Sequence, residues 1–262
     1  MKVRIAKFLA ERGVGSRRAA EKLVESGAVS VNGATVSSPV FFVDGTEKIT
    51  VSGRMIKPEK ETRLYAFHKP VNTLATASDP SGRRTIYDVL PKRFGNLKYI
   101  GRLDYKTTGL LLLTNDGELA RRLTLPENHV KRVYIAKLHP KKFGDASVSG
   151  ARSMTALKKF LSPTSADDSV FDILRTGAKI GGVNYAPMRI DLISRYPLNV
   201  KITLTEGKKN EIRTAFDYIG LPVAKLHRVS YGEIKLGNLS AGKIIELDKR
   251  EIERVCGNIR DL

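Results

Sequence analysis

A short polar segment of the chain combines residue types that acid–base or nucleophilic chemistry could use. The segment Gly101-Arg102-Leu103-Asp104 places an aspartate beside an arginine, and four consecutive leucines, Leu110–Leu113, follow it. Such a run is typical of a buried strand, so we expect Asp104 in a loop that leads into the core. A carboxylate supported by a rigid strand can act as a nucleophile or a general base when it is ionised. An aspartate in a polar loop is also the ordinary residue of a turn.

The elements around this segment predict a larger domain over residues 63–262. Asn115-Asp116-Gly117 is typical of a turn, and a helix is expected over Gly117–Leu123. The alternation of strand-like runs with helices favours a mixed α/β domain that is mainly antiparallel. We expect its strands at Leu64–Phe67, Val133–Lys137, Met188–Ile193, Val200–Leu204 and Lys243–Leu247, and a second helix at Asn210–Ile219.

The first 57 residues predict a small α/β unit of their own, so the fold class is α+β. Apolar residues at helical spacing predict a helix over Lys2–Glu11, and Ser16 is a good N-cap for a second helix, Arg17–Ser26. The Asn32-Gly33 pair predicts a hairpin, because both residues tolerate positive φ. Residues 58–62 are polar and charged and are expected to be a linker.

The charge balance favours a polyanionic partner. Lysine and arginine number 46 against 27 aspartates and glutamates, which gives a net charge of +19 and a pI near 10.0. Binding to phosphates is favourable because it releases condensed counterions. Alternatively, the positive charge could serve only to keep the protein soluble, or could bind a membrane surface. Basic side chains gather on or before the expected second helix, where they could bind RNA phosphates or form a solvated face: Arg12, Arg17, Arg18 and Lys22.

Several classes of protein are disfavoured. No apolar run approaches the ~20 residues of a membrane span, and the first residues lack a signal-peptide pattern, so we expect a cytoplasmic protein. Cys256 is the single cysteine, and the four histidines lack ligand spacing, which predicts neither a disulfide nor a metal site. Gly181-Gly182 lacks a phosphate-loop pattern. We expect a monomer without a cofactor.

Two stretches resemble known families. The N-terminal motifs Arg4–Ala10, Gly13–Glu21 and Val29–Gly33 resemble the RNA-binding module of ribosomal protein S4. The segment from Gly101 to Gly109, with its leucine strand and Thr114–Ala120, resembles the signature of pseudouridine synthases. Further matching segments are His68–Pro70, Asp79–Thr85, Asp88–Pro91, Val130–Tyr134, Thr205–Lys208 with Ile212-Arg213, Leu226–Gly232 and Leu239–Gly242. The pattern is most similar to the branch that acts on ribosomal RNA, and within it to the large-subunit enzymes.

The resemblance implies roles for particular residues. Asp104 corresponds to the essential catalytic aspartate, and Tyr134 to a tyrosine that stacks on the flipped uracil. Arg213 corresponds to the arginine that pairs with the catalytic aspartate. Arg213 could instead bind phosphate, and Tyr134 could be a core residue. Arg102 is expected to fill the gap that the uridine leaves in the RNA stack, and Ile202 and Leu204 to form the apolar floor of the uracil pocket.

The chain departs from the family pattern at two places. Asn72 replaces a glycine, and asparagine tolerates the same left-handed turn. The family pattern Asn-Arg-Gln is replaced by Lys209-Asn210-Glu211, and the second arginine of the pattern is replaced by Thr214. These changes remove positive charge and add a carboxylate. A non-catalytic RNA-binding assembly factor is the main alternative function, and it could lose Asp104, Tyr134 or Arg213, all of which this chain has. A methyltransferase or a DNA-binding protein is disfavoured, because neither a glycine-rich cofactor loop nor a recognition-helix arrangement is evident.

Overall fold

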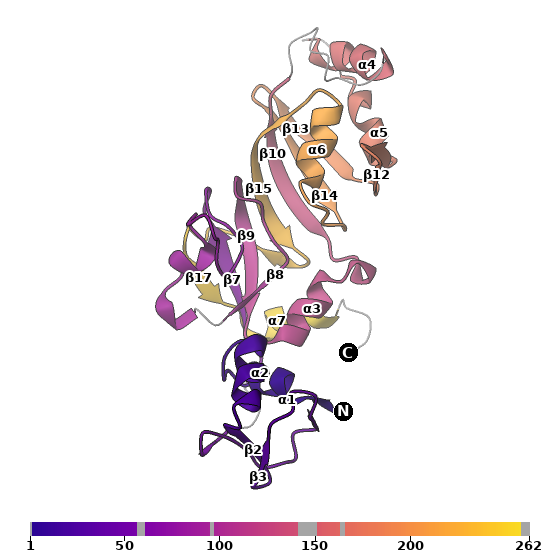
Figure 1. The fold of residues 1–262 in the computed structure, drawn as a ribbon. Coiled ribbons are helices and arrows are strands. Elements are labelled where there is room, and N and C mark those ends of the chain that lie inside the picture. Colours follow the sequence, from indigo (N-terminus) through magenta and orange to yellow (C-terminus); the bar gives the residue numbers. More distant parts are fainter. Residues whose placement is uncertain (1, 57–60, 95–96, 141–150, 163–165, 258–262) are drawn as a thin grey trace.

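The computed structural model describes residues 2–56, 61–94, 97–140, 151–162 and 166–257. The expected linker therefore lies largely outside the described residues. The N-terminal part occupies one end of an elongated molecule, and the helices α4 (Ala151–Leu161) and α5 (Asp172–Arg175) lie at the other end (Figure 1). No helix in the described part of the chain is both long and apolar enough to cross a membrane.

The N-terminal part has its own hydrophobic core between two helices and a small sheet. The helices are α1 (Ile5–Glu11) and α2 (Arg17–Glu25), and the core residues are all drawn from positions 5–49. The four-stranded sheet has the order β3-β2-β5-β6, with β2 at Val29–Val31, β3 at Ala34–Val36, β5 at Ile49–Val51 and β6 at Arg54–Met55.

Local sequence signals explain most of these elements. Ser16 caps α2 by accepting a hydrogen bond from the Ala19 amide at 3.1 Å. Asn32 and Gly33 turn the β2–β3 hairpin with φ values of 52° and 86°. The first helix starts later than expected, because Val3–Arg4 form a strand, β1, that pairs with β4 (Phe42–Val43).

A nine-stranded sheet forms the core of the larger part. Its strands follow the order β13-β14-β10-β15-β9-β7-β17, with β16 beside β15 and β8 beside β9. All of its pairings are antiparallel except the parallel contact between β15 and β9. The strands are β7 (Leu64–Lys69), β8 (Lys98–Ile100), β9 (Thr107–Thr114), β10 (Arg132–Leu138), β13 (Arg189–Arg195), β14 (Leu198–Leu204), β15 (Val223–Tyr231), β16 (Ile234–Lys235) and β17 (Ile244–Glu246).

Both faces of this sheet are covered. The leucine run of β9 alternates between two clusters: Leu111 and Leu113 enter the larger one, and Leu110 and Leu112 the smaller one. A strand buried on both faces reads as a continuous apolar run, which explains the leucines before the Asn115 turn. Besides α4 and α5, the larger part has the helices α3 (Gly117–Thr124), α6 (Glu211–Tyr218) and α7 (Lys249–Gly257). A separate hairpin joins β11 (Ala178–Ile180) to β12 (Val183–Tyr185).

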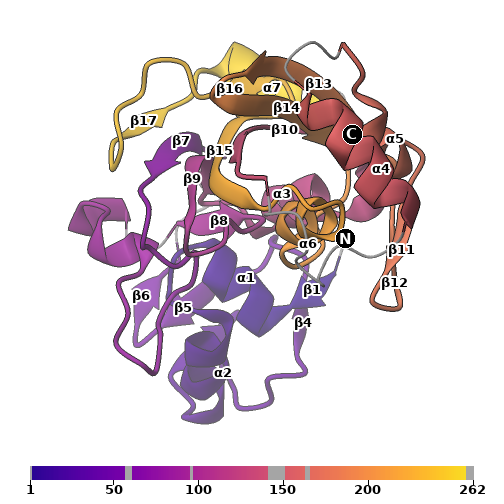
Figure 2. The ribbon, with the colours of Figure 1, turned by 90° about the horizontal axis from the view of Figure 1, so that it is seen from above.

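The sheet bends into a curved wall. Seen from above, β9, β15, β10 and β14 follow one another along an arc (Figure 2). Helix α6 contacts β15 and the strand β11 of the separate hairpin. The predicted mixed and mainly antiparallel domain, with a small α/β module before it, is confirmed.

Candidate active site

The Asp104 loop joins β8 to β9 and is held by its backbone. The Thr107 amide donates to the Asp104 carbonyl at 3.0 Å, and the Asn72 amide donates to the Tyr105 carbonyl at 2.9 Å. Asn72 has a φ of 56°, so it keeps the left-handed turn in which the family pattern has glycine. Leu103 is buried while Asp104 is exposed. The loop therefore presents the carboxylate without needing it for its own fold.

A single row across the sheet carries the side chains around this loop. The inter-strand register aligns Ile202 of β14 with Tyr134 of β10, Tyr134 with Arg228 of β15, and Arg228 with Gly109 of β9. Gly109 in turn pairs with Lys69 of β7. Residues from five strands thus meet at one level of the sheet, where the Asp104 loop enters it.

Lys69 is fully buried beside the Asp104 loop. Its ammonium donates to the Thr107 carbonyl at 2.8 Å and to the Pro70 carbonyl at 3.0 Å. Burial lowers the pKa of Lys69 to about 8, while the charge of Asp104 opposes that shift and the charge of Arg228 adds to it. Lys69 thus ties β7 to the start of β9 and places a positive charge near the Asp104 carboxylate.

This burial predicts how stability depends on pH. Between pH 8 and 10.5 the unfolded chain holds a proton that folded Lys69 has released, so the wild type gains stability as pH rises. Lys69→Met lacks this contribution. In urea unfolding at several pH values, the free energy of unfolding of the wild type should rise relative to that of the variant across that window, by at most ~1.4 kcal/mol per pH unit. A stability difference that stays constant from pH 7 to 10.5 would contradict a depressed pKa.

Tyr134 and Arg228 form the centre of the site. The Tyr134 hydroxyl accepts a hydrogen bond from Arg228 Nη1 at 3.4 Å, and Arg228 Nε donates to the Leu110 carbonyl at 2.7 Å. Arg228 is 1% exposed, and its guanidinium lies 5.0 Å from the Tyr231 ring centroid. Sequence reasoning included Arg228 in a matching segment without giving it a role. Its lack of a carboxylate partner among the described residues cannot be recognised from sequence.

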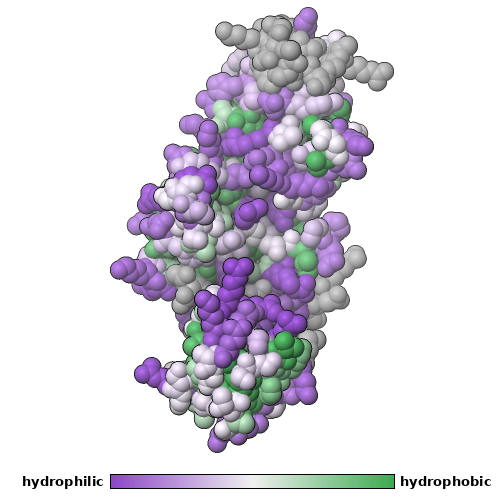
Figure 3. Space-filling view, viewed as in Figure 1, coloured by the Kyte–Doolittle hydropathy of each residue, from purple (hydrophilic) through white to green (hydrophobic). Residues whose placement is uncertain are grey.

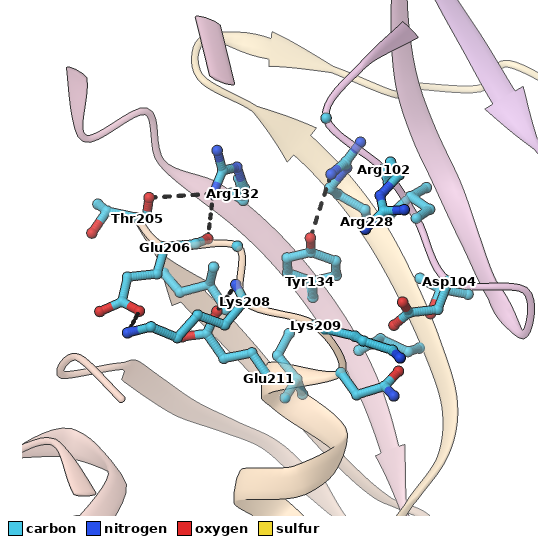
Figure 4. A pocket seen from close by; sticks show the side chains of 18 of the residues that line it. Arg102, Asp104, Arg132, Tyr134, Thr205, Glu206, Lys208, Lys209, Glu211 and Arg228 are labelled. Atoms are coloured by element: carbon cyan, nitrogen blue, oxygen red, sulfur yellow. Dashed lines mark hydrogen bonds and ion pairs between the residues drawn. The ribbon is translucent and has the colours of Figure 1, made fainter. Parts of the chain in front are cut away.

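A pocket of about 650 Å³ opens at this level of the sheet. Five of the predicted site residues line it: Arg102, Asp104, Tyr134, Leu204 and Arg213. Figure 4 shows the Tyr134 ring between Asp104 on one side and the Glu206, Lys208 and Glu211 side chains on the other. Ile202 does not line the pocket, because its side chain is fully buried in the larger hydrophobic cluster.

Arg213 reaches the pocket from α6 without forming an ion pair with Asp104 in the described part of the chain. Its Nη1 donates to the Val223 carbonyl at 3.0 Å, and its Nη2 is buried without a partner. The structure thus brings Asp104 and Arg213 to one pocket, and their pairing stays a prediction.

The wall beyond Tyr134 is charged and was not predicted. Arg132 donates to the carbonyls of Thr205 and Glu206 and, at 3.3 Å, to the Tyr231 hydroxyl. Lys208 forms an ion pair with Glu206. Glu211 is 4% exposed, and burial raises the pKa of its carboxyl group. The sequence signals for this wall were two segments that match the family pattern, Val130–Tyr134 and Thr205–Lys208, and the departure at Glu211, and none of them gave these side chains a role.

The cationic residues of the N-terminal part lie apart from the pocket. Arg18 and Lys22 are exposed on α2, Arg17 lies 3.8 Å from Glu21, and Arg12 stacks 3.4 Å from the Phe8 ring centroid. Hydrophilic side chains gather over α1 and α2 (Figure 3). The described residues contain no cluster of three or more histidine, cysteine or acidic side chains that could hold a metal ion.

Comparisons with known proteins agree on one family. Residues 63–218 match the model of RNA pseudouridylate synthases, and residues 3–59 match that of the S4 domain. An uncharacterized RNA pseudouridine synthase of Rickettsia typhi is 36% identical over 97% of this chain and 96% of its own length. The ribosomal large subunit pseudouridine synthase B of Bacillus subtilis is 33% identical over 96% of this chain and 95% of its own. A solved pseudouridylate synthase structure has a TM-score of 0.63 and 25% identity, covering 97% of this chain and 99% of that one.

Proposed function

The chain belongs to the RNA pseudouridine synthase family, and on that premise we propose that it converts uridine to pseudouridine in large-subunit ribosomal RNA with Asp104 as the catalytic carboxylate. The observation that carries the role of Asp104 is its position, exposed at the pocket beside Tyr134 on a loop fixed by backbone hydrogen bonds. The Bacillus subtilis relative, whose name places its activity on the large ribosomal subunit, supports the choice of RNA.

The reaction is an isomerisation with balanced bonds. The bond between N1 and the sugar carbon C1′ breaks, the base turns, and a bond forms between C5 and C1′; C5 loses a proton and N1 gains one. No electrons are gained or lost overall, so we expect no cofactor. Asp104 can act on the sugar or the base as a nucleophile, or remove a sugar proton as a base, and each of these roles needs it ionised.

The pocket suits a uridine that has left its helix stack. Extrusion of a base costs a few kcal/mol, and least in a loop. Tyr134 offers an aromatic face for the base, and Leu204 an apolar wall. Arg213 pairs with Asp104 once RNA excludes water, through its unpartnered Nη2. Arg102 is exposed at the rim and fills the space in the stack.

We further propose that the three segments 1–57, 58–62 and 63–262 act as an RNA-binding module, a linker and a catalytic domain. The protein acts as a cytoplasmic monomer in this proposal. Its N-terminal module adds phosphate contacts to those of the catalytic domain, which is consistent with the net charge of +19.

The deciding experiment incubates the purified protein with unmodified large- and small-subunit ribosomal RNA, beside an Asp104→Asn variant. Pseudouridine is mapped by carbodiimide-dependent stops of primer extension. A stop in large-subunit RNA made by the wild type alone would establish the activity, the residue and the target. Tight binding of both proteins without any stop, on naked RNA and on assembling particles, would favour the assembly-factor alternative.

The α2 cations predict a change in salt dependence. Arg18 and Lys22 are exposed and have no ion pair among the described residues. Replacing either with alanine should reduce the slope of log affinity against log salt by about 0.7–0.9, the loss of roughly one phosphate contact. Arg12→Ala should change the slope less, because its guanidinium stacks on Phe8. Equal slopes for wild type, Arg18→Ala and Lys22→Ala, measured by fluorescence anisotropy with the mapped RNA segment, would exclude α2 from RNA contact.

A further inference from the structure

Unsatisfied buried polar atoms gather at the pocket. Four such side-chain atoms occur among the described residues, and every one belongs to a pocket-lining residue: Thr107 Oγ1, Glu211 Oε1, Arg213 Nη2 and Arg228 Nη2. Leaving a buried polar atom unpaired costs about 1–3 kcal/mol, so such atoms at a binding site are available to a ligand. Only Glu211 presents a carboxylate oxygen, which in its ionised form is an acceptor and nothing else.

Glu211 is held in place by its second oxygen. Glu211 Oε2 accepts a hydrogen bond from the Lys208 amide at 3.0 Å, which leaves Oε1 buried and unpartnered. Burial raises the pKa of Glu211, and the neighbouring charge of Glu206 adds to that shift; Lys208 and Arg132 oppose it. Both oxygens of Glu206 are already in use, by the Ala186 amide and by the Lys208 ammonium. Glu211 is therefore the carboxylate of this wall that can bind a ligand.

The position of Tyr134 sets the direction of a bound base. Asp104 and Glu211 lie on opposite sides of the Tyr134 ring (Figure 4). A base stacked on this ring with its sugar at Asp104 directs its far edge toward Glu211. In uridine that edge carries N3–H, the only N–H donor of the base. In cytidine the same ring nitrogen is an acceptor, and an acceptor facing a carboxylate oxygen leaves both unsatisfied.

Resting on the proposed function, we propose that Glu211 Oε1 accepts the N3–H hydrogen bond of the flipped-out uracil and so selects uridine over cytidine. The same contact suits the turning of the base. Rotation by half a turn about the line from N3 to C6 exchanges N1 with C5 and one carbonyl with the other, but leaves N3 in place. Glu211 can therefore hold N3–H before and after the base turns, while C5 replaces N1 at the sugar.

The test exchanges an acceptor for a donor. Glu211→Gln keeps an oxygen for the Lys208 amide and places an NH₂ group where Oε1 was. Tritium release from [5-³H]uridine in the mapped RNA segment measures kcat/KM, and the same segment with cytidine at the target position serves as a competitor. We expect kcat/KM to fall about 10- to 100-fold and the cytidine competitor to bind about tenfold more tightly to the variant than to the wild type, the range of one base-reading contact. Glu206→Gln is the matched control and should keep the wild-type preference between the two RNAs.

A second measurement needs no variant. RNA with 3-methyluridine at the target lacks N3–H, and the wild type should bind it at least tenfold more weakly than uridine RNA. If Glu211→Gln loses activity but binds the cytidine competitor as the wild type does, Glu211 only supports the Lys208 backbone. If the wild type binds 3-methyluridine RNA as tightly as uridine RNA, the assignment is also overturned. Wild-type protein that releases no tritium would overturn the proposed function itself, which distinguishes the two failures.

Discussion

Replacing Asp104 with asparagine should abolish pseudouridine formation while leaving the fold and RNA binding intact. The loop is held by the backbone bonds of Thr107 and Asn72, and neither uses the carboxylate. The side chain is exposed, so the amide fits without repacking. Loss of a group that acts directly on the substrate typically lowers the rate by about ten-thousand-fold or more. An effect of that size is expected whether Asp104 acts as a nucleophile or as a base, because asparagine can do neither.

Single-turnover tritium release with excess enzyme isolates this effect from RNA binding. Asp191→Asn is a suitable control, since Asp191 is half-buried on β13, does not line the pocket, and in the described part of the chain forms its ion pair with exposed Arg189. It should keep wild-type rates. Asp104→Asn that retained a tenth of the wild-type rate would move the chemistry to another residue of the pocket.

The strands that could be predicted were those with a local signal. The leucine run of β9 and the alternation in β10 and β14 gave correct positions to within three residues at each end. The longest strand, β15, was not predicted. Its sequence, Val223–Tyr231, contains Lys225, His227 and Arg228, which interrupt any apolar period. It becomes a strand because β10 and β9 pair with it on its two sides, and that is a tertiary effect.

The residues of the site also divide into those that the sequence identifies and those that only the fold identifies. Asp104, Tyr134 and Arg213 could be named because the motif resemblance identifies them singly. Arg228 and Lys69 are buried cations whose meaning depends on neighbours from distant strands: Arg228 Nε binds the Leu110 carbonyl across 118 residues. Ile202 and Leu204 are two residues apart and share one face of β14, so which of them reaches the pocket depends on where along the strand the cavity opens. Side-chain type suggests such roles, and only the register of the sheet decides them.

Gly109→Ala should be the most destabilising single-methyl change in the site. Gly109 stands in the register row between Lys69 and Arg228, at the parallel contact of β9 with β15. A Cβ there would lie 2.2 Å from the Arg228 carbonyl oxygen and 2.6 Å from its amide nitrogen. These are backbone atoms of a strand paired on both sides, so they cannot move aside as a flexible side chain would. The φ of Gly109, +109°, is also strained for any residue with a Cβ.

Overpacking and backbone strain each cost about 1–3 kcal/mol, so the free energy of unfolding should fall by about 3 kcal/mol or more in urea titrations at pH 7. Gly237→Ala separates the two causes, because Gly237 has a φ of +56° with no atom near its added Cβ. It should lose only about 1 kcal/mol from strain. Equal losses for the two variants would mean that β15 shifts away from β9 at little cost. In that case Gly109→Ala would fold but move Arg228 relative to Tyr134, and its main defect would be found in kcat, with a loss of stability no greater than that of Gly237→Ala.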